Sequence, residues 1–119
     1  METQVLGSDE FDLLVKEHKL LFIDFWAQWC APCKPFSMVY EQVAEQYPQI
    51  KFLKVNIEKQ KELVDFLGIR SIPYLMAIKD EIVIYSNAGS IGEKTLIQLA
   101  NQLLQVDVSA IKQLIQGDV

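Results

Sequence analysis

An apolar run from Leu20 to Trp26, broken only by Asp24, is the strongest pattern in the chain. Because the run is nearly continuous and does not alternate, it predicts a central strand that is covered on both faces. A second strand, with Lys54 inside it, is predicted over 50–57. We also expect a short first strand at Val5-Leu6, ahead of the first helix.

Four stretches place apolar residues three and four positions apart, which is typical of amphipathic helices. They cover 8–18, 36–47, 59–67 and, after Gly92, 96–104. Ser8 is the predicted N-cap of the first helix, Pro48 ends the second and Gly68 ends the third. In the third helix the residues expected to face inward are Leu63, Val64, Phe66 and Leu67.

Two short apolar runs late in the chain, 74–78 and 82–85, flank Lys79-Asp80-Glu81 and predict a β-hairpin. Strands and helices alternate before the hairpin, so the full order is β, α, β, α, β, α, β, β, α. That order predicts an α/β fold with a mixed central sheet and helices on both faces.

A C-terminal extension, residues 105–119, follows a domain that we place at residues 1–104. Ser109 is the predicted cap of a short helix in this extension, and Gly117 ends it. The apolar face of that helix consists of Ile111, Leu114 and Ile115. We favour packing of this face on the same domain, and the alternative is a partner or self-association site.

Composition limits the classes of function. The chain has 119 residues, enough for one domain with a single core, and a net charge of -5. An acidic surface argues against nucleic acid or an anionic membrane as the main partner. No apolar stretch approaches the ~20 residues of a membrane span. The first residues carry no signal-like pattern, so we expect a cytoplasmic protein.

Cys30 and Cys33 are the only cysteines, and they stand where the central strand gives way to the second helix. A helix N-terminus favours negative charge and can stabilise the thiolate of the first cysteine. This spacing at this junction therefore indicates redox chemistry. In a reducing compartment such a pair is more often catalytic than structural.

Three other interpretations of the pair are open. A structural disulfide between such near neighbours closes a very small loop and adds little stability. A zinc site needs about four ligands, and the chain offers two thiols and one imidazole, His18, unless two chains share the metal. Inert core cysteines would leave the flanking Trp29 and Pro32 without explanation.

Asp24 is an acid inside an otherwise apolar strand. A buried carboxylate is costly unless it is paired, hydrated or protonated, so desolvation is expected to raise its pKa above ~3.9. Lys54 would act in the opposite direction if it lies close. The plainer alternative is a partly exposed Asp at a strand end, but perturbed acids cluster at functional sites.

Three segments together resemble the thioredoxin family. They are 23–34, with Asp24, both tryptophans and the cysteine pair; 54–57, Lys-Val-Asn-Ile; and 68–73, Gly-Ile-Arg-Ser-Ile-Pro, with Gly89 later. Their order and spacing match the family over roughly residues 5–104. The resemblance implies a thioredoxin-like fold and a thiol-disulfide oxidoreductase that reduces protein disulfides.

The resemblance also implies a role for each matching residue. Cys30 would attack a substrate disulfide, and Cys33 would resolve the resulting mixed disulfide. Asp24, with Lys54 nearby, would assist proton transfer at Cys33. Pro73 would be a cis-proline facing the disulfide, where the alternative is a trans proline that begins an edge strand. The substrate groove would be lined by Trp29, Ala31, Pro32, Ile72, Pro73 and Gly89.

No bound cofactor or metal is implied, because the cysteine pair is itself the redox centre. The implied partners are disulfide-containing proteins and a thioredoxin reductase as electron donor, and we expect a monomer. A disulfide oxidant or isomerase is the nearest alternative function. A non-catalytic binding module and a metal or iron-sulfur scaffold are alternatives of other classes.

Five positions depart from the usual family pattern: Ala31 in place of Gly, Pro35, Met38 in place of Pro, Tyr74 in place of Thr, and Glu81 in place of a turn Gly. These differences bear on substrate range and redox potential. Pro35 is expected to bend the second helix if that helix begins as early as Cys30. Glu81 implies a changed turn if the usual Gly has a positive φ.

Overall fold

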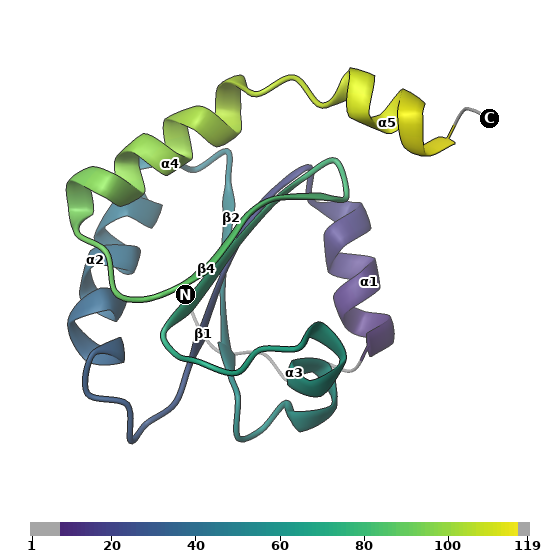
Figure 1. Cartoon of the computed structure of the whole chain (residues 1–119). Coiled ribbons are helices and arrows are strands. Elements are labelled where there is room, and N and C mark those ends of the chain that lie inside the picture. Colours follow the sequence, from purple (N-terminus) through teal and green to yellow (C-terminus); the bar gives the residue numbers. More distant parts are fainter. Residues whose placement is uncertain (1–7, 117–119) are drawn as a thin grey trace.

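A computed structural model describes residues 8–116 of the chain (Figure 1). The strand predicted at Val5-Leu6 lies outside the described residues. The elements, in chain order, are α1 (Ser8–Glu17), β1 (Leu20–Trp26), α2 (Cys33–Gln46), β2 (Lys51–Asn56), α3 (Lys61–Leu67), β3 (Tyr74–Lys79), β4 (Ile82–Ala88), α4 (Glu93–Gln105) and α5 (Ser109–Gln116). No helix within 8–116 is long and apolar enough to cross a membrane.

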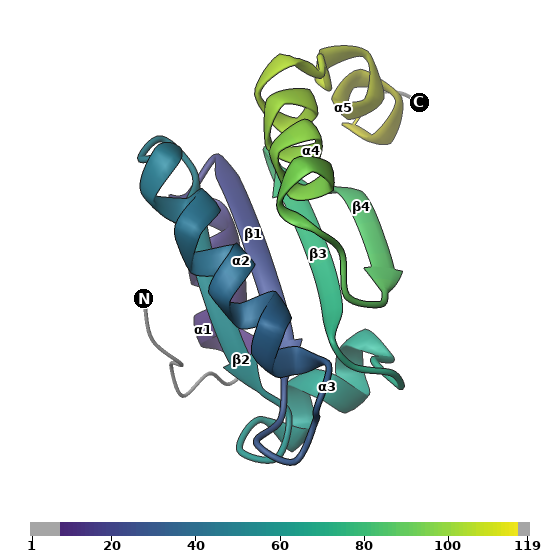
Figure 2. The ribbon, with the colours of Figure 1, turned by 90° about the vertical axis from the view of Figure 1, so that its left-hand side faces the viewer.

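The strands form one mixed sheet in the order β2-β1-β3-β4. β1 runs parallel to β2 and antiparallel to β3, and β3 pairs antiparallel with β4. Helices α2 and α4 cover one face of the sheet, and α1 and α3 cover the other (Figures 1 and 2). The predicted α/β fold with helices on both faces is confirmed.

The side chains on the two faces of β1 pack into two separate cores, because side chains alternate between the two faces along a strand. Leu21, Ile23 and Phe25 are buried in the cluster that faces α1 and α3. Phe22 is buried in the other cluster, with Phe36 and Tyr40 of α2. By the same alternation Asp24 lies on the face of Phe22, beneath α2.

The prediction that Phe66 faces inward is wrong, because its side chain is 71% exposed. Leu63 is fully buried, and Val64 and Leu67 are partly buried against the same core. At 3.6 residues per turn, Phe66 lies roughly 100° around the helix from the middle of that face. A helix of seven residues buries only one narrow stripe, and Phe66 is outside it.

The β3–β4 hairpin keeps a two-residue turn with φ of 51° at Asp80 and 69° at Glu81. Lys79 pairs with Ile82 across this turn. Positive φ at both central residues is the feature of the hairpin turns that prefer Gly second. Glu81 therefore adopts the left-handed region itself, although it has a side chain.

Glu81→Gly is expected to stabilise the protein by about 0.5–1 kcal/mol, because Gly reaches this φ without the penalty on a side chain. Chemical denaturation of the two proteins measures the difference. Glu45→Gly, at an exposed position within α2, is the matched control and should destabilise by about 1 kcal/mol. An equal loss in both variants would contradict the turn geometry.

Lys79 secures the end of α4 to the sheet. Its side chain is buried, and its ammonium donates to the carbonyls of Leu104 at 3.1 Å and Val106 at 2.6 Å. The last carbonyls of a helix lack partners within it, and a cation there also suits the helix dipole. This contact fixes the point from which the chain leaves α4 toward α5.

The extension does form a helix, α5, at the top of the molecule in Figures 1 and 2. Val108, just before it, is buried, but Leu114 is 82% exposed and Ile111 is also exposed. The favoured prediction, that this apolar face packs on the same domain, is therefore wrong for these two residues. Gly117 and the side chain of Ile115 lie outside the described part, and the division at residue 104 stays a prediction.

Candidate functional site

Cys30 and Cys33 form a disulfide at the start of α2, with their Cα atoms 5.3 Å apart. The turn that carries them is closed by backbone hydrogen bonds, from Cys30 to the Ala27 carbonyl and from Cys33 to the Cys30 carbonyl, each at 3.2 Å. Both sulfurs belong to residues that are almost fully buried, packed with Ala27, Trp26, Ile57 and Ile72. The pair therefore sits in an apolar shell at the C-terminal end of β1.

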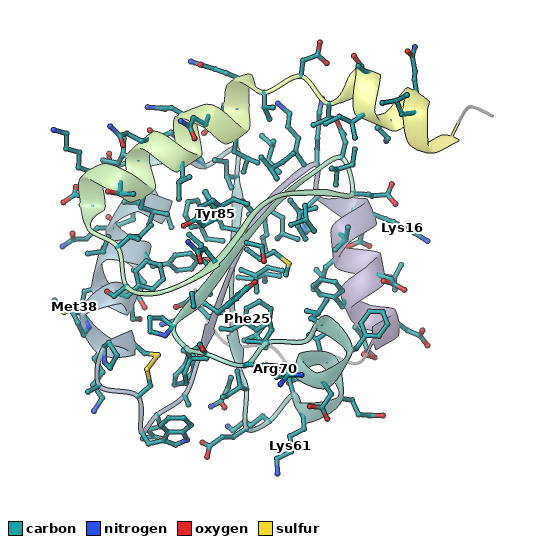
Figure 3. The ribbon with its side chains drawn as sticks, in the orientation of Figure 1. Lys16, Phe25, Met38, Lys61, Arg70 and Tyr85 are labelled. Atoms are coloured by element: carbon teal, nitrogen blue, oxygen red, sulfur yellow. A yellow bond between two sulfur atoms is a disulfide. The ribbon has the colours of Figure 1, made fainter. Side chains whose placement is uncertain are left out.

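The start of α2 at Cys33 explains why Pro35 is tolerated. Pro35 occupies the first turn, where backbone N–H groups have no partner within the helix, so the missing N–H costs nothing there. The bend was expected only for a helix that begins at Cys30, and α2 begins at Cys33. Met38, which stands in place of the usual family Pro, points outward from α2 (Figure 3) and is exposed.

Two further loops meet the cysteine turn at this end of the sheet. The Ile72–Pro73 peptide bond is cis, and Ile72 packs against the disulfide cluster. Gly89, at the end of β4, donates its N–H to the Pro73 carbonyl at 2.8 Å. Its φ of 116° is a conformation that side chains rarely adopt, which favours Gly at this position.

The predicted groove residues thus come from three segments that converge on the disulfide. Trp29 is 65% exposed, and Ala31, Pro32 and Gly89 are also exposed. Ile72 is partly buried and Pro73 is buried. Tyr74, the unusual residue after the proline, turns to the other face of the sheet, where it packs near Phe25 and its hydroxyl bonds to Ser86 Oγ.

Asp24 is fully buried between its strand neighbours Lys54 on β2 and Leu75 on β3. Neither of its carboxylate oxygens has a hydrogen-bond partner in the described part of the chain. Desolvation therefore dominates and raises the pKa of Asp24 from 3.8 to about 7. The Lys54 charge lowers that pKa and the Glu41 charge raises it, both by less than burial does.

Lys54 is beside Asp24 in register, but its ammonium is bound elsewhere. The Nζ atom lies 3.2 Å from Glu41 Oε2 and donates to Ser37 Oγ. It also sits 5.5 Å from the ring centroid of Trp26, within cation–π range. No ion pair between Lys54 and Asp24 is present in the described residues, so the carboxyl is left in its desolvated environment.

A cavity of about 270 Å³ opens beside these groups. It is lined by Trp26, Ala27, Gln28, Cys33, Lys34, Ser37 and Lys54. Cys33, which begins α2, and Lys54, the register partner of Asp24 on β2, thus line the same cavity. A space of this size can hold water beside Cys33.

Comparison with known proteins decides the family. The thioredoxin family model matches residues 2–113, nearly the whole chain. The chain is a member of the thioredoxin family.

Individual relatives agree with this assignment. The chain is 37% identical over 110 residues to a putative thioredoxin 2 of Streptomyces coelicolor, covering 92% of this chain and 82% of that protein. It is 30% identical over 112 residues to thioredoxin 1 of Plasmodium falciparum, covering 94% and 92%. A thioredoxin structure from Halobacterium salinarum superimposes with a TM-score of 0.79 at 26% identity, covering 88% of this chain and 92% of that one.

This thioredoxin is a dithiol thiol-disulfide oxidoreductase that reduces protein disulfides. Thioredoxins work through a redox-active cysteine pair, and their substrates are proteins that contain disulfides. The alternative of a Cys and His zinc site within one chain is not supported by the geometry. His18 precedes β1 whereas the cysteines follow it, so seven residues of extended strand separate them.

Sequence reasoning missed two residues of the site, Ser37 and Glu41. Both hold the Lys54 ammonium, and together with Cys33 they are spaced four residues apart along α2. Residues at this spacing share one face of a helix. The signal was therefore present as two polar residues aligned with Cys33, but nothing in the sequence said that Lys54 would reach them.

Proposed function

We propose that Cys30 attacks the substrate disulfide and that Cys33 resolves the product, with Asp24 as the proton acceptor for Cys33. The observation that carries this proposal is a fully buried Asp24 without hydrogen-bond partners, on the face of the sheet that is covered by α2, the helix that begins with Cys33. An acid with a pKa of about 7 exchanges protons efficiently at neutral pH.

The proposed cycle balances as two thiol-disulfide exchanges. The Cys30 thiolate attacks one sulfur of the substrate disulfide, forms a mixed disulfide and expels the other sulfur as a thiolate. Cys33 then passes its proton to the Asp24 carboxylate and attacks the Cys30 sulfur. This step closes the Cys30–Cys33 bond and releases the second substrate sulfur as a thiolate. Two electrons have moved from the cysteine pair to the substrate.

The exposed loops around the disulfide supply the proposed binding groove. Trp29, Ala31 and Pro32 present one wall, and Ile72, Pro73 and Gly89 present the other. An extended substrate segment that enters between them brings its disulfide to the cysteine turn. The second step needs no bimolecular encounter, because Cys33 is only three residues from Cys30 in the same chain.

The partners and setting complete the proposal. A thioredoxin reductase returns two electrons to the Cys30–Cys33 disulfide, so the pair itself carries electrons between reductase and substrate and needs no bound cofactor. The protein acts as a monomer in the cytoplasm, where it maintains cellular redox balance. The net charge of -5 is compatible with a freely diffusing protein and disfavours nonspecific binding to nucleic acid, whose phosphates are also negative.

Reduction of disulfide-linked insulin chains, with dithiothreitol as the electron source, tests this function. The wild-type protein should accelerate the appearance of the insoluble free chain at catalytic concentrations. A variant with both cysteines changed to Ser should give only the rate of dithiothreitol alone. Equal rates with and without the wild-type protein would favour a binding module and overturn the proposal.

A further inference from the structure

The face of α2 above Asp24 carries a polar row, of which the reaction scheme uses only Cys33. Cys33, Ser37 and Glu41 follow one another at intervals of four residues, so they line one side of the helix. Ser37 Oγ contacts Glu41 Oε2 at 3.4 Å, and both bind the Lys54 ammonium. The row therefore connects the resolving cysteine to the lysine that is next to Asp24 in the sheet.

We propose that Glu41, assisted by Ser37, is a positioning residue that holds the Lys54 ammonium at the wall of the cavity beside Cys33 and away from the Asp24 carboxyl. This inference rests on the proposed role of Asp24 and adds the group that protects it. Two carboxyl groups, those of Asp24 and Glu41, are available to pair with Lys54, and the observed ion pair is with Glu41 at 3.2 Å. Asp24 is the other candidate, because it is the register partner of Lys54 on the adjacent strand.

The position of the Lys54 ammonium affects how readily Asp24 accepts a proton. An ammonium bound to the Asp24 carboxylate would favour its charged form and make it a poorer proton acceptor. With Lys54 held by Glu41, burial governs Asp24, and the negative charge of Glu41 acts in the same direction as burial. The ammonium remains on the cavity wall with Cys33, where positive charge favours the Cys33 thiolate.

Other groups facing Asp24 do not compete with this control. From α2, the Tyr40 hydroxyl donates to the Leu53 carbonyl at 2.6 Å, and burial keeps the pKa of Tyr40 well above its ordinary value, so it stays neutral. From β3 the neighbour is Leu75. The residues of α4 in this core are apolar: Leu96, Ala100 and Leu103. The charges that set the state of Asp24 are thus Lys54 and Glu41.

The test is the titration of the Asp24 carboxyl carbon, followed by NMR in the oxidised protein. Glu41→Gln removes the anion that holds Lys54, so the midpoint should fall by at least ~0.3 pH unit, roughly a twofold change in the ratio of ionised to protonated carboxyl. Glu45→Gln, the same charge change one turn further along α2, is the control and should leave the midpoint in place. Glu41→Asp keeps the charge but shortens the reach, and it should also lower the midpoint.

The pH profile for release of a mixed disulfide is the second readout. In Glu41→Gln this profile should move to lower pH with the Asp24 midpoint, while attack by Cys30 keeps its wild-type profile. An unchanged midpoint in Glu41→Gln, an equal shift in Glu45→Gln, or wild-type behaviour of Glu41→Asp would each overturn the positioning role. If Asp24→Asn leaves release unchanged, the proposed role of Asp24 fails instead, so the two failures are distinguishable.

Discussion

The Cys33→Ser variant is expected to stop after the first exchange and to accumulate a mixed disulfide with its substrate. The reason is that Cys30 can still attack, but no second thiol is present to release it. Cys30→Ser should form no mixed disulfide, and both variants should lose turnover down to the rate of the reductant alone. Intact-protein mass spectrometry after mixing with a disulfide substrate, followed by acid quenching, measures the adduct.

The pair of variants also assigns the two roles. The exposed fractions of the cysteines are nearly equal in the oxidised protein, so exposure alone does not identify the attacking thiol. The assignment rests on position, since Cys33 is fixed as the first residue of α2 and lines the cavity next to Lys54. Adducts on Cys33 in the Cys30→Ser variant, with none in Cys33→Ser, would reverse it.

Asp24→Asn is expected to lower turnover by about 10²-fold, the lower end for loss of a general base. The loss should appear in release of the mixed disulfide and not in its formation by Cys30. Rapid-quench measurement of the two steps separates them. Slowed attack with unchanged release would assign Asp24 to the first step, and no change in either would make it a structural residue.

The same substitution has an effect on stability that depends on pH. The pKa of Asp24 is higher in the folded protein, about 7, than its ordinary value of 3.8, so the folded state binds the proton more tightly. The free energy of unfolding therefore keeps its full value below pH 4 and falls by about 4 kcal/mol as the pH rises toward 7. Asp24→Asn removes this loss.

Denaturation of both proteins between pH 4 and pH 8 checks this expectation. The Asn variant should gain stability relative to the wild type as the pH rises, and the gain should level off above pH 7. The comparison of slopes is independent of any fixed cost of burying the Asn amide. Parallel curves for the two proteins would contradict a raised pKa for Asp24.

The fold was largely predictable because its main signals are local. The apolar run of β1, broken only by Asp24, matches a strand buried on both faces, and Pro48 and Gly68 end helices where expected. Errors arose where an apolar residue lies at the edge of a short helical face, as Phe66 does on α3 and Leu114 on α5. Periodicity predicts which residues share a side, but not how far neighbouring elements extend to cover it.

The types of residue in the site were more predictable than the contacts among them. The cysteine spacing pointed to Cys30 and Cys33, and the lone acid in β1 pointed to Asp24, which is buried on the face of the sheet that α2 covers. The partner of Lys54 was not predictable, because Glu41 comes from a different element and meets it only through the packing of α2 on the sheet. The cis Ile72–Pro73 bond likewise followed from family resemblance and not from local sequence rules.

The reduction potential of the Cys30–Cys33 couple decides between a disulfide reductase and a disulfide oxidant, because it sets the direction in which electrons flow. The protein would be equilibrated in glutathione or dithiothreitol buffers of known potential, and the fraction of disulfide would be counted after thiol alkylation. We expect a value near the ~-270 mV of a reducing thioredoxin. A value near the ~-120 mV of a strong dithiol oxidant would contradict it and make the protein a donor of disulfides.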